Sequence, residues 1–177
     1  MHRAAGMLVA AVGTLSAPSA NATIVISSDR GGLVSDYAAR FLSARDSGEL
    51  VVIDGPCLSA CTLVVGMVPR NNVCATPKAV LGFHSAWRPV RGKRVPSAEA
   101  SQAMLDVYPT ALREWIGHRG GLSPKMIFLY GRELAGIVRP CAPAVVASLS
   151  KVAKPVTSPK LRRIRPTPFP VRAKHYS

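Results

Sequence analysis

Two short β-branched runs separated by an amphipathic segment are the feature that most constrains how this chain folds. The first run is Thr23–Ile26, followed by turn-forming residues through Gly32, and the second is Leu50–Ile53, closed by Asp54-Gly55-Pro56. Between them, one helical face collects six apolar residues: Leu33, Val34, Tyr37, Ala38, Phe41 and Leu42. A strand–helix–strand succession joins parallel strands through a crossover helix. The sequence therefore predicts an α/β fold with a parallel sheet covered by helices.

Further elements are expected downstream of this unit. The expected strands are Val73–Ala75 and Val80–Phe83, and the segment around Ser59-Ala60-Cys61 is expected to form a buried helix. A longer helix is expected after Ser97 with a kink at Pro109, because a mid-helix proline removes a hydrogen bond. The remaining expectations are a helix start at Ser123-Pro124, a short helix around Arg132–Val138 and a basic loop over Arg88–Val95.

The positive charge is concentrated at the C-terminal end. The chain has a formal net charge of +14, but residues 23–141 carry fourteen basic and nine acidic residues. Residues 142–177 carry eight Lys or Arg, no acid and many prolines, which predicts a basic disordered tail after a single domain at 23–141. The Leu161–Arg165 cluster suits an anionic surface such as lipid headgroups or cell-wall polymers. The alternative is a solvated tail without a partner; no aromatic interleaving indicates base stacking, so no nucleic acid is expected.

The N-terminus has the pattern of a secretory signal peptide. Arg3 precedes a run of small and apolar residues from Ala4 to Leu15, and Ala20-Asn21-Ala22 offers a small-x-small cleavage site. The alternative is a membrane anchor, but the run has about a dozen residues against the roughly 20 that span a bilayer. Residues 1–22 are therefore predicted to be removed, and the protein is expected to be exported, periplasmic or extracellular.

Four cysteines in an exported chain predict two disulfides. Cys57, Cys61, Cys74 and Cys141 allow three pairings. A Cys61–Cys74 bridge would tie the helix after Ser59 to the next strand and leave Cys57 for Cys141. The alternative is a zinc site that also uses His84, but the chain has no Cys-x-x-Cys pair and Cys-x-x-x-Cys is a weak metal signature. No metal and no cofactor are expected.

Three features that could take part in a reaction are expected at one edge of the sheet. Ser59 follows a Gly-Pro turn, His84 ends an apolar strand, and Gly31-Gly32 follows the first strand. Sites of open α/β sheets collect at the carboxyl ends of the strands. Taken singly, each has an ordinary explanation: a serine N-cap, a packed histidine and a glycine turn.

The order of these motifs resembles the Clp protease proteolytic subunit and the wider Clp/crotonase superfamily, especially its small exported branch. The matching strings are Ser28-Asp29-Arg30-Gly31-Gly32, Gly55-Pro56-Cys57-Leu58-Ser59-Ala60 and Leu81-Gly82-Phe83-His84, and the interval from Ser59 to His84 is 25 positions. The resemblance covers Ile24 to Cys141. It implies a serine peptidase with Ser59 as nucleophile, His84 as general base and the N–H groups of Gly32 and Ala60 as oxyanion hole. It further implies a peptide or protein substrate and a homo-oligomer.

One departure from the family's pattern concerns the acid that orients the histidine. The corresponding stretch, residues 123–128, has no carboxylate, and Glu133 resembles a residue of the following helix. Either a backbone carbonyl or another acid such as Asp106 or Asp36 holds His84, or catalysis is weak or lost. The second hypothesis is therefore a non-catalytic relative that acts as a disulfide-stabilised binding or assembly module on an anionic surface.

Overall fold

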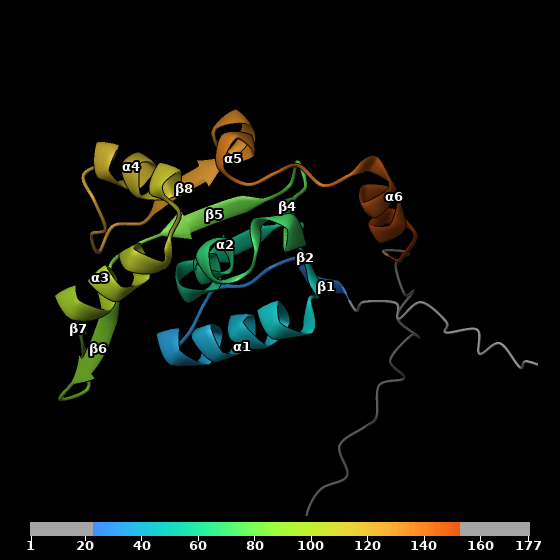
Figure 1. Cartoon of the computed structure of the whole chain (residues 1–177). Helices are drawn as coiled ribbons and strands as arrows, with labels where there is room; N and C mark the ends of the chain where they lie inside the picture. The colour runs from blue at the N-terminus through green and yellow to red at the C-terminus, as the bar shows by residue number, and fades with distance from the viewer. Residues whose placement is uncertain (1–22, 153–177) are drawn as a thin grey trace, which may run out of the picture. The chain divides into compact units, whose positions relative to one another are not determined.

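The computed structural model describes residues 23–152 and has a mixed α/β architecture (Figure 1). Its first sheet consists of β1 (Thr23–Ile26), β2 (Leu50–Ile53) and β4 (Val73–Ala75), all parallel, in the order β1-β2-β4. The apolar runs of the sequence predicted the bounds of these strands correctly. Val51, Val52 and Ile53 of the central strand are fully buried, as expected where elements cover both faces of a parallel sheet.

A second small sheet carries the strands next to the candidate site. β3 (Pro56–Leu58) and β5 (Val80–Phe83) are parallel, and β8 (Ile127–Tyr130) pairs with β5 in the antiparallel sense. The sequence predicted β5 but neither of its neighbours. The helix expected at Ser123-Pro124 was wrong: this segment bends into β8, and its Ser123 carbonyl accepts a hydrogen bond from the Ser85 N–H at 2.8 Å. The β-prone Ile-Phe-Leu-Tyr run finds its hydrogen-bond partners on β5.

The helices lie on both sides of the strands. Figure 1 shows α1 (Val34–Ser47) on one side and α4 (Thr110–His118) and α5 (Gly131–Ile137) on the other. The short segments η1 (Ser59–Leu63) and α2 (Val64–Met67) contact α1, and η2 (Arg70–Asn72) leads into β4. α1 buries Phe41 and Ala44 and ends at Gly48, whose φ of 70° is the left-handed conformation that glycine adopts without strain.

Pro109 separates two helices instead of kinking one. α3 (Ala98–Val107) starts at the N-cap Ser97, whose hydroxyl accepts from the Ala100 N–H at 3.3 Å. α4 starts after Pro109, which has an extended backbone with ψ of 152°. The expected kink was wrong because a proline disfavours helical geometry in the residue before it, so the chain breaks there.

The disulfides join Cys57 to Cys61 and Cys74 to Cys141. The expected pairing of Cys61 with Cys74 was wrong. The sharp turn after β3 brings the Cα atoms of Cys57 and Cys61 to 5.3 Å, and the chain after α5 runs beside β4. The Cys141 N–H donates to the Ala75 carbonyl at 3.0 Å, which sets Cys141 next to Cys74. Two disulfides are compatible with export into an oxidising compartment.

The C-terminal end begins with a helix where disorder was expected. Contacts divide the chain between Ala142 and Pro143, and α6 (Pro143–Val152) follows that division. The prediction of disorder from residue 142 was wrong at its start, because Pro143 suits a first helical turn and the good helix formers Ala144, Ala147 and Leu149 follow. The predicted signal peptide 1–22 and the tail from residue 153 lie outside the described residues. Within residues 23–152, no helix combines the length and apolarity needed to cross a bilayer.

Candidate active site

Ser59 lies at a strained turn between a strand and a helix. Leu58, the last residue of β3, is extended with φ of −112°, and Ser59 then has φ of +56° before η1 continues the chain. A residue with a Cβ in the left-handed region costs about 1–2 kcal/mol, so surrounding contacts must hold it there. Ser59 is itself neither buried nor fully exposed.

A buried hydroxyl pair clamps the backbone of this turn. The Thr62 hydroxyl donates to the Ser59 carbonyl oxygen at 2.6 Å, and the Tyr108 hydroxyl lies 2.6 Å from the same Thr62 oxygen. Because the single Thr62 proton goes to the carbonyl, Tyr108 must donate to Thr62. Burial raises the pKa of Tyr108 well above its ordinary range, which keeps that donor protonated. Sequence reasoning missed both residues, because nothing local links Thr62 to a tyrosine in α3's C-terminal flank.

The Cys57–Cys61 disulfide brackets Ser59 from both sides. Cys57 lies in β3 and Cys61 in η1, and both are fully buried. The bridge therefore closes a short ring around the turn, so that the strand and the following helix cannot separate there. All four cysteines are in disulfides. Among residues 23–152, no three His, Cys, Asp or Glu side chains gather around a possible metal position.

His84 follows the strand next to that of Ser59. Leu58 is the register partner of Gly82 across the parallel β3–β5 pair, so Ser59 and His84 both come just after the carboxyl ends of adjacent strands. The His84 Nδ1 lies 2.7 Å from the Ser85 carbonyl oxygen. Because a carbonyl only accepts, Nδ1 donates this hydrogen bond, and in the neutral ring this tautomer leaves the Nε2 lone pair available. In the described part of the chain, no hydrogen bond links the Ser59 hydroxyl to the His84 ring.

The acids considered as partners of His84 are engaged elsewhere. The Asp106 carboxylate accepts from Gln102 at 2.8 Å, and Asp36 accepts from the Ser35 hydroxyl at 3.3 Å. Glu133 binds Arg119 at 2.8 Å. Among the described residues the Ser85 backbone carbonyl is thus the hydrogen-bond partner that fixes the His84 ring.

The glycine loop after β1 lies directly against the Ser59 turn. A Cβ on Gly31, whose φ is +77°, would come within 2.5 Å of the Leu58 carbonyl oxygen and 2.7 Å of the Ser59 Cβ. The same position is 2.9 Å from the Ala60 nitrogen, so only a glycine fits here. Sequence reasoning singled out Gly32 for the oxyanion hole; Gly31 is the residue packed on the turn, and Gly32 follows it with its α-carbon facing the Tyr37 ring.

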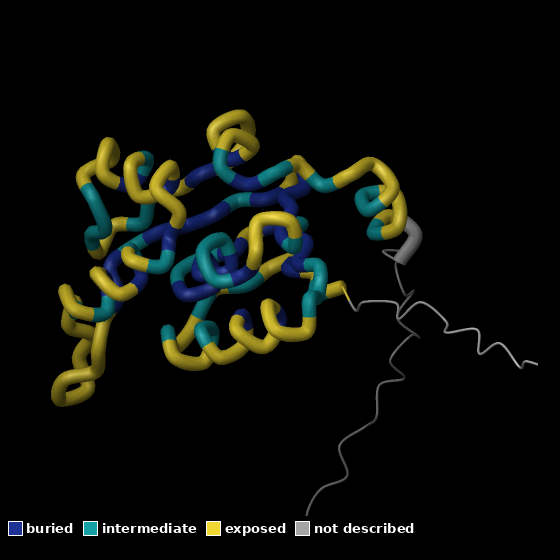
Figure 2. The backbone as a smooth tube through the Cα atoms, in the orientation of Figure 1, coloured by how far each residue is buried: buried dark blue, intermediate teal, exposed yellow. Residues whose placement is uncertain are grey.

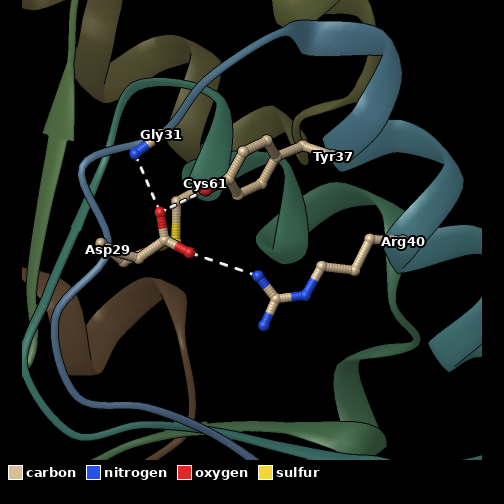
Figure 3. Close-up of polar contacts among 6 residues, drawn as sticks. Asp29, Gly31, Tyr37, Arg40 and Cys61 are labelled. Atoms are coloured by element: carbon tan, nitrogen blue, oxygen red, sulfur yellow. Dashed lines mark hydrogen bonds and ion pairs between the residues drawn. A yellow bond between two sulfur atoms is a disulfide. The ribbon is translucent and has the colours of Figure 1, made fainter. Parts of the chain in front are cut away.

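Asp29 holds this loop in place, and sequence reasoning assigned it no role. Figure 3 shows its carboxylate accepting from the Gly31 N–H at 2.8 Å, from the Tyr37 hydroxyl and from Arg40 at 3.3 Å. Burial, followed by the hydrogen bond to Asp29, raises the pKa of Tyr37 from 10.0 to about 12. Asp29 also pairs through its backbone with β3, where the Leu58 N–H donates to its carbonyl at 2.8 Å. The local signal was present: an aspartate two residues before a glycine is typical of an Asx turn.

A groove lies next to Ser85, the residue that follows His84. It has a volume of about 390 Å³ and is bounded by the segment after β5, by α3 and the residues just before it, and by the segment before β8. Its lining includes Ser85, the residue whose carbonyl binds His84, together with Ser101, Gln102, Leu105, Leu122 and Pro124. The lining mixes apolar and hydrogen-bonding side chains, as small-molecule and peptide side-chain sites do.

Comparison with known proteins yields distant structural likenesses. No family model matches the chain, and no curated protein matches its sequence. A peptidase from Plasmodium falciparum aligns with a TM-score of 0.42 at 5% identity, covering 67% of this chain and 76% of that one. A mutant of ClpP1 from Listeria monocytogenes aligns with a TM-score of 0.35 at 13% identity, covering 67% and 89%. Scores in this range define neither a family nor an activity, so any function has to be argued from the residues of this chain.

Proposed function

We propose that the protein is an exported serine hydrolase that cleaves peptides, with Ser59 as nucleophile and His84 as general base. The observation that carries the proposal is the left-handed backbone of Ser59 at the end of β3. A nucleophilic serine on a sharp strand-to-helix turn presents its hydroxyl above the edge of a sheet, as in α/β hydrolases. Strain of about 1–3 kcal/mol is retained where a functional geometry requires it.

The proposed chemistry is acyl transfer. The Ser59 Oγ attacks the scissile carbonyl carbon while the His84 Nε2 takes its proton, and the Nδ1 proton stays bonded to the Ser85 carbonyl. Collapse of the tetrahedral intermediate expels the amine, which receives the proton from Nε2. Water then hydrolyses the acyl-enzyme with His84 again acting as base. A neutral carbonyl stabilises the imidazolium less than a carboxylate, so the rate should be modest.

The oxyanion would be bound by two backbone N–H groups, those of Gly32 and Ala60. Ala60 lies at the start of η1, where N–H groups lack partners within the helix. The contact of Gly31 with Ser59 and Ala60 supports this arrangement, because it brings the glycine loop to the nucleophile turn. Asp29 would act by positioning that loop. A substrate side chain has the groove beside Ser85 available to it.

The wider biological setting rests on the same proposal. Residues 1–22 would be cleaved as a signal peptide, and the catalytic domain would span 23–141 in a periplasmic or extracellular protein. The motif order supports membership of the small exported branch of the Clp/crotonase superfamily. Members of that superfamily commonly form rings, so a homo-oligomer is part of the proposal. The basic tail 142–177 would bind an anionic surface.

Labelling with a fluorophosphonate probe tests the proposal directly. The probe's phosphorus bonds to an activated serine oxygen with loss of fluoride, and we expect labelling of the full chain that disappears in Ser59→Ala and weakens strongly in His84→Ala. The matched control is Ser35→Ala, an exposed serine on α1, which should label like the unchanged protein. No labelling, or labelling that persists in Ser59→Ala, would overturn the hydrolase.

A second function is favoured by one observation: His84 has a carbonyl and no carboxylate as its partner in the described chain. The protein would then be a non-catalytic binding or assembly module with the same fold. Under this alternative, truncation after Ala142 weakens binding to anionic lipid vesicles while Ser59→Ala leaves every property unchanged. Unaltered vesicle binding by the truncated chain in moderate salt would exclude it.

A further inference from the structure

The segment after His84 forms a β-hairpin that the sequence had suggested to be a loop. β6 (Trp87–Val90) and β7 (Lys93–Pro96) pair in the antiparallel sense, with Trp87 opposite Pro96 and Val90 opposite Lys93. Arg91 and Gly92 form the connection with φ of 49° and 75°. Two consecutive residues with positive φ are the signature of a type I′ turn, which matches the twist of a two-stranded ribbon. The hairpin is therefore a defined element.

The base of the hairpin is fixed to the body of the domain. The Ala86 N–H donates to the buried Ser101 hydroxyl at 2.9 Å, and the Ser97 N–H donates to the Ala86 carbonyl at 2.8 Å. Beyond this base both strands are exposed along their length (Figure 2), and in Figure 1 they extend away from the helices. A ribbon held at one end with both faces exposed is a preformed surface that needs little ordering to bind a partner.

The hairpin carries an unneutralised positive charge. Its four cations are Arg88, Arg91, Lys93 and Arg94, and no Asp or Glu occurs from residue 85 to residue 98. None of the ion pairs in the described chain involves these four side chains. Like charges this close repel one another in the free protein. An acidic partner would relieve that repulsion, so the charge pattern favours a partner that carries carboxylates.

The distribution of apolar residues favours a polypeptide over a lipid surface. By the strand register, one face holds Trp87 with Arg94, and the other holds Val90 and Val95 with Lys93. The Arg94 guanidinium stacks on the Trp87 ring at 4.4 Å from its centre. A membrane-surface element segregates its apolar side chains onto one face, whereas both faces here alternate cations with apolar groups. Such alternation complements a chain that itself mixes carboxylates with aliphatic side chains.

We propose that the β6–β7 hairpin is a docking surface for an acidic segment of another polypeptide. The Arg and Lys side chains pair with its carboxylates, while Trp87, Val90 and Val95, each more than a third exposed, contact its apolar side chains. The hairpin starts three residues after His84, so a docked segment would lie near the candidate site. The proposal does not depend on catalysis and goes beyond the hydrolase: it concerns binding alone.

Fluorescence anisotropy of a labelled peptide of alternating Glu and Val tests this surface. The full chain carries Ser59→Ala so that bound peptide is not consumed, and the C-terminal basic residues are identical in every variant. We expect Arg88→Glu with Arg94→Glu to weaken binding about tenfold, since each reversal removes an exposed ion pair and adds a repulsion. The matched control reverses Arg70 and Arg132, two exposed cations outside the hairpin, and should change affinity about twofold or less.

Three outcomes would overturn the proposal. One is no measurable binding of the acidic peptide by the unreversed chain, and another is equal weakening by the hairpin and control reversals. In the third, the hairpin reversals abolish binding to phosphatidylserine vesicles but leave peptide binding intact, which would assign the hairpin to a membrane. Circular dichroism of each variant checks that the fold is retained.

Discussion

The hydroxyls of Thr62 and Tyr108 form a hydrogen-bonded clamp on the Ser59 carbonyl. This clamp predicts that one mutation in the pair partly restores the stability that the other removes. Thr62→Val keeps the shape of the side chain but removes the donor to the Ser59 carbonyl and leaves the buried Tyr108 hydroxyl without its acceptor. Two lost hydrogen bonds and one unsatisfied hydroxyl should lower the free energy of unfolding by about 3 kcal/mol. Tyr108→Phe removes only the outer bond and should lower it by about 1 kcal/mol.

The double variant distinguishes a real clamp from two independent side chains. With Thr62→Val already present, Tyr108→Phe removes the orphaned hydroxyl, so the double variant should lose about 2 kcal/mol and be more stable than Thr62→Val alone. Urea unfolding of the three variants measures these values. Additive losses, with the double variant the least stable, would refute the inference that the two hydroxyls bond to one another.

The same variants report on the candidate site. If the clamp holds the Ser59 turn, then Thr62→Val should slow fluorophosphonate labelling about tenfold, equivalent to about 1.4 kcal/mol of lost positioning. Thr62→Ser keeps the hydroxyl and should label at nearly the original rate, although it loses a buried methyl group. A Thr62→Ser variant as slow as Thr62→Val would mean that packing, and not the hydrogen bond, positions the turn.

Three further predictions concern the backbone conformation at Gly31 and Ser59 and the hydroxyl of Tyr37. Gly31→Ala should abolish labelling and lower the free energy of unfolding by more than about 2 kcal/mol, because the new Cβ meets backbone atoms. The control is Gly48→Ala, which has a similar φ and nothing within 4 Å, and it should cost only about 1 kcal/mol in urea unfolding. Ser59→Gly should be about 1 kcal/mol more stable than Ser59→Ala while both fail to label; equal stabilities would argue against strain at this position. Folding raises the pKa of Tyr37 from 10.0 to about 12, so this group contributes stability that is complete below pH 10 and lost as the pH rises to 12. The urea midpoint should therefore fall less across this pH range in Tyr37→Phe than in the unchanged protein. An identical fall in both would contradict the prediction.

The sequence predicted those elements whose local pattern is unambiguous. β1, β2, β4 and β5 are short, mostly apolar runs, and their bounds were correct. The elements that were missed depend on partners distant in sequence. β8 follows a Ser-Pro pair that is typical of a helix start, and only the exposed edge of β5 makes it a strand. The hairpin contains two prolines and four cations, which locally indicate a loop.

In the candidate site too, the features with a local sequence pattern were predicted, and the contacts between distant residues were not. The sequence predicted Ser59, His84 and the glycine pair as candidates for one edge of the sheet, because the carboxyl ends of parallel strands meet at the same edge. The contacts that support the site could not be predicted from the sequence, because they join residues far apart in it. Tyr108 contacts Thr62 across 46 residues, and the disulfide partners depend on where residues 139–141 return to β4. The hydrogen-bond partner of His84 is a backbone carbonyl, which the sequence offered only as one of several alternatives. Every residue has a carbonyl, so the residue types give no signal for such a partner.

The ordinary explanation of Ser59, a helix N-cap, does not fit its geometry. An N-cap serine has an extended backbone and accepts a hydrogen bond from an N–H of the first turn. Here Leu58 holds the cap position, no side chain caps η1, and Ser59 has the positive φ that an N-cap avoids. The Cys57–Cys61 disulfide brackets Ser59, the Thr62 hydroxyl bonds its carbonyl, and the Gly31 loop packs against it. Three supports around a strained serine whose hydroxyl serves no structural bond in the described chain are best explained by a use for that hydroxyl.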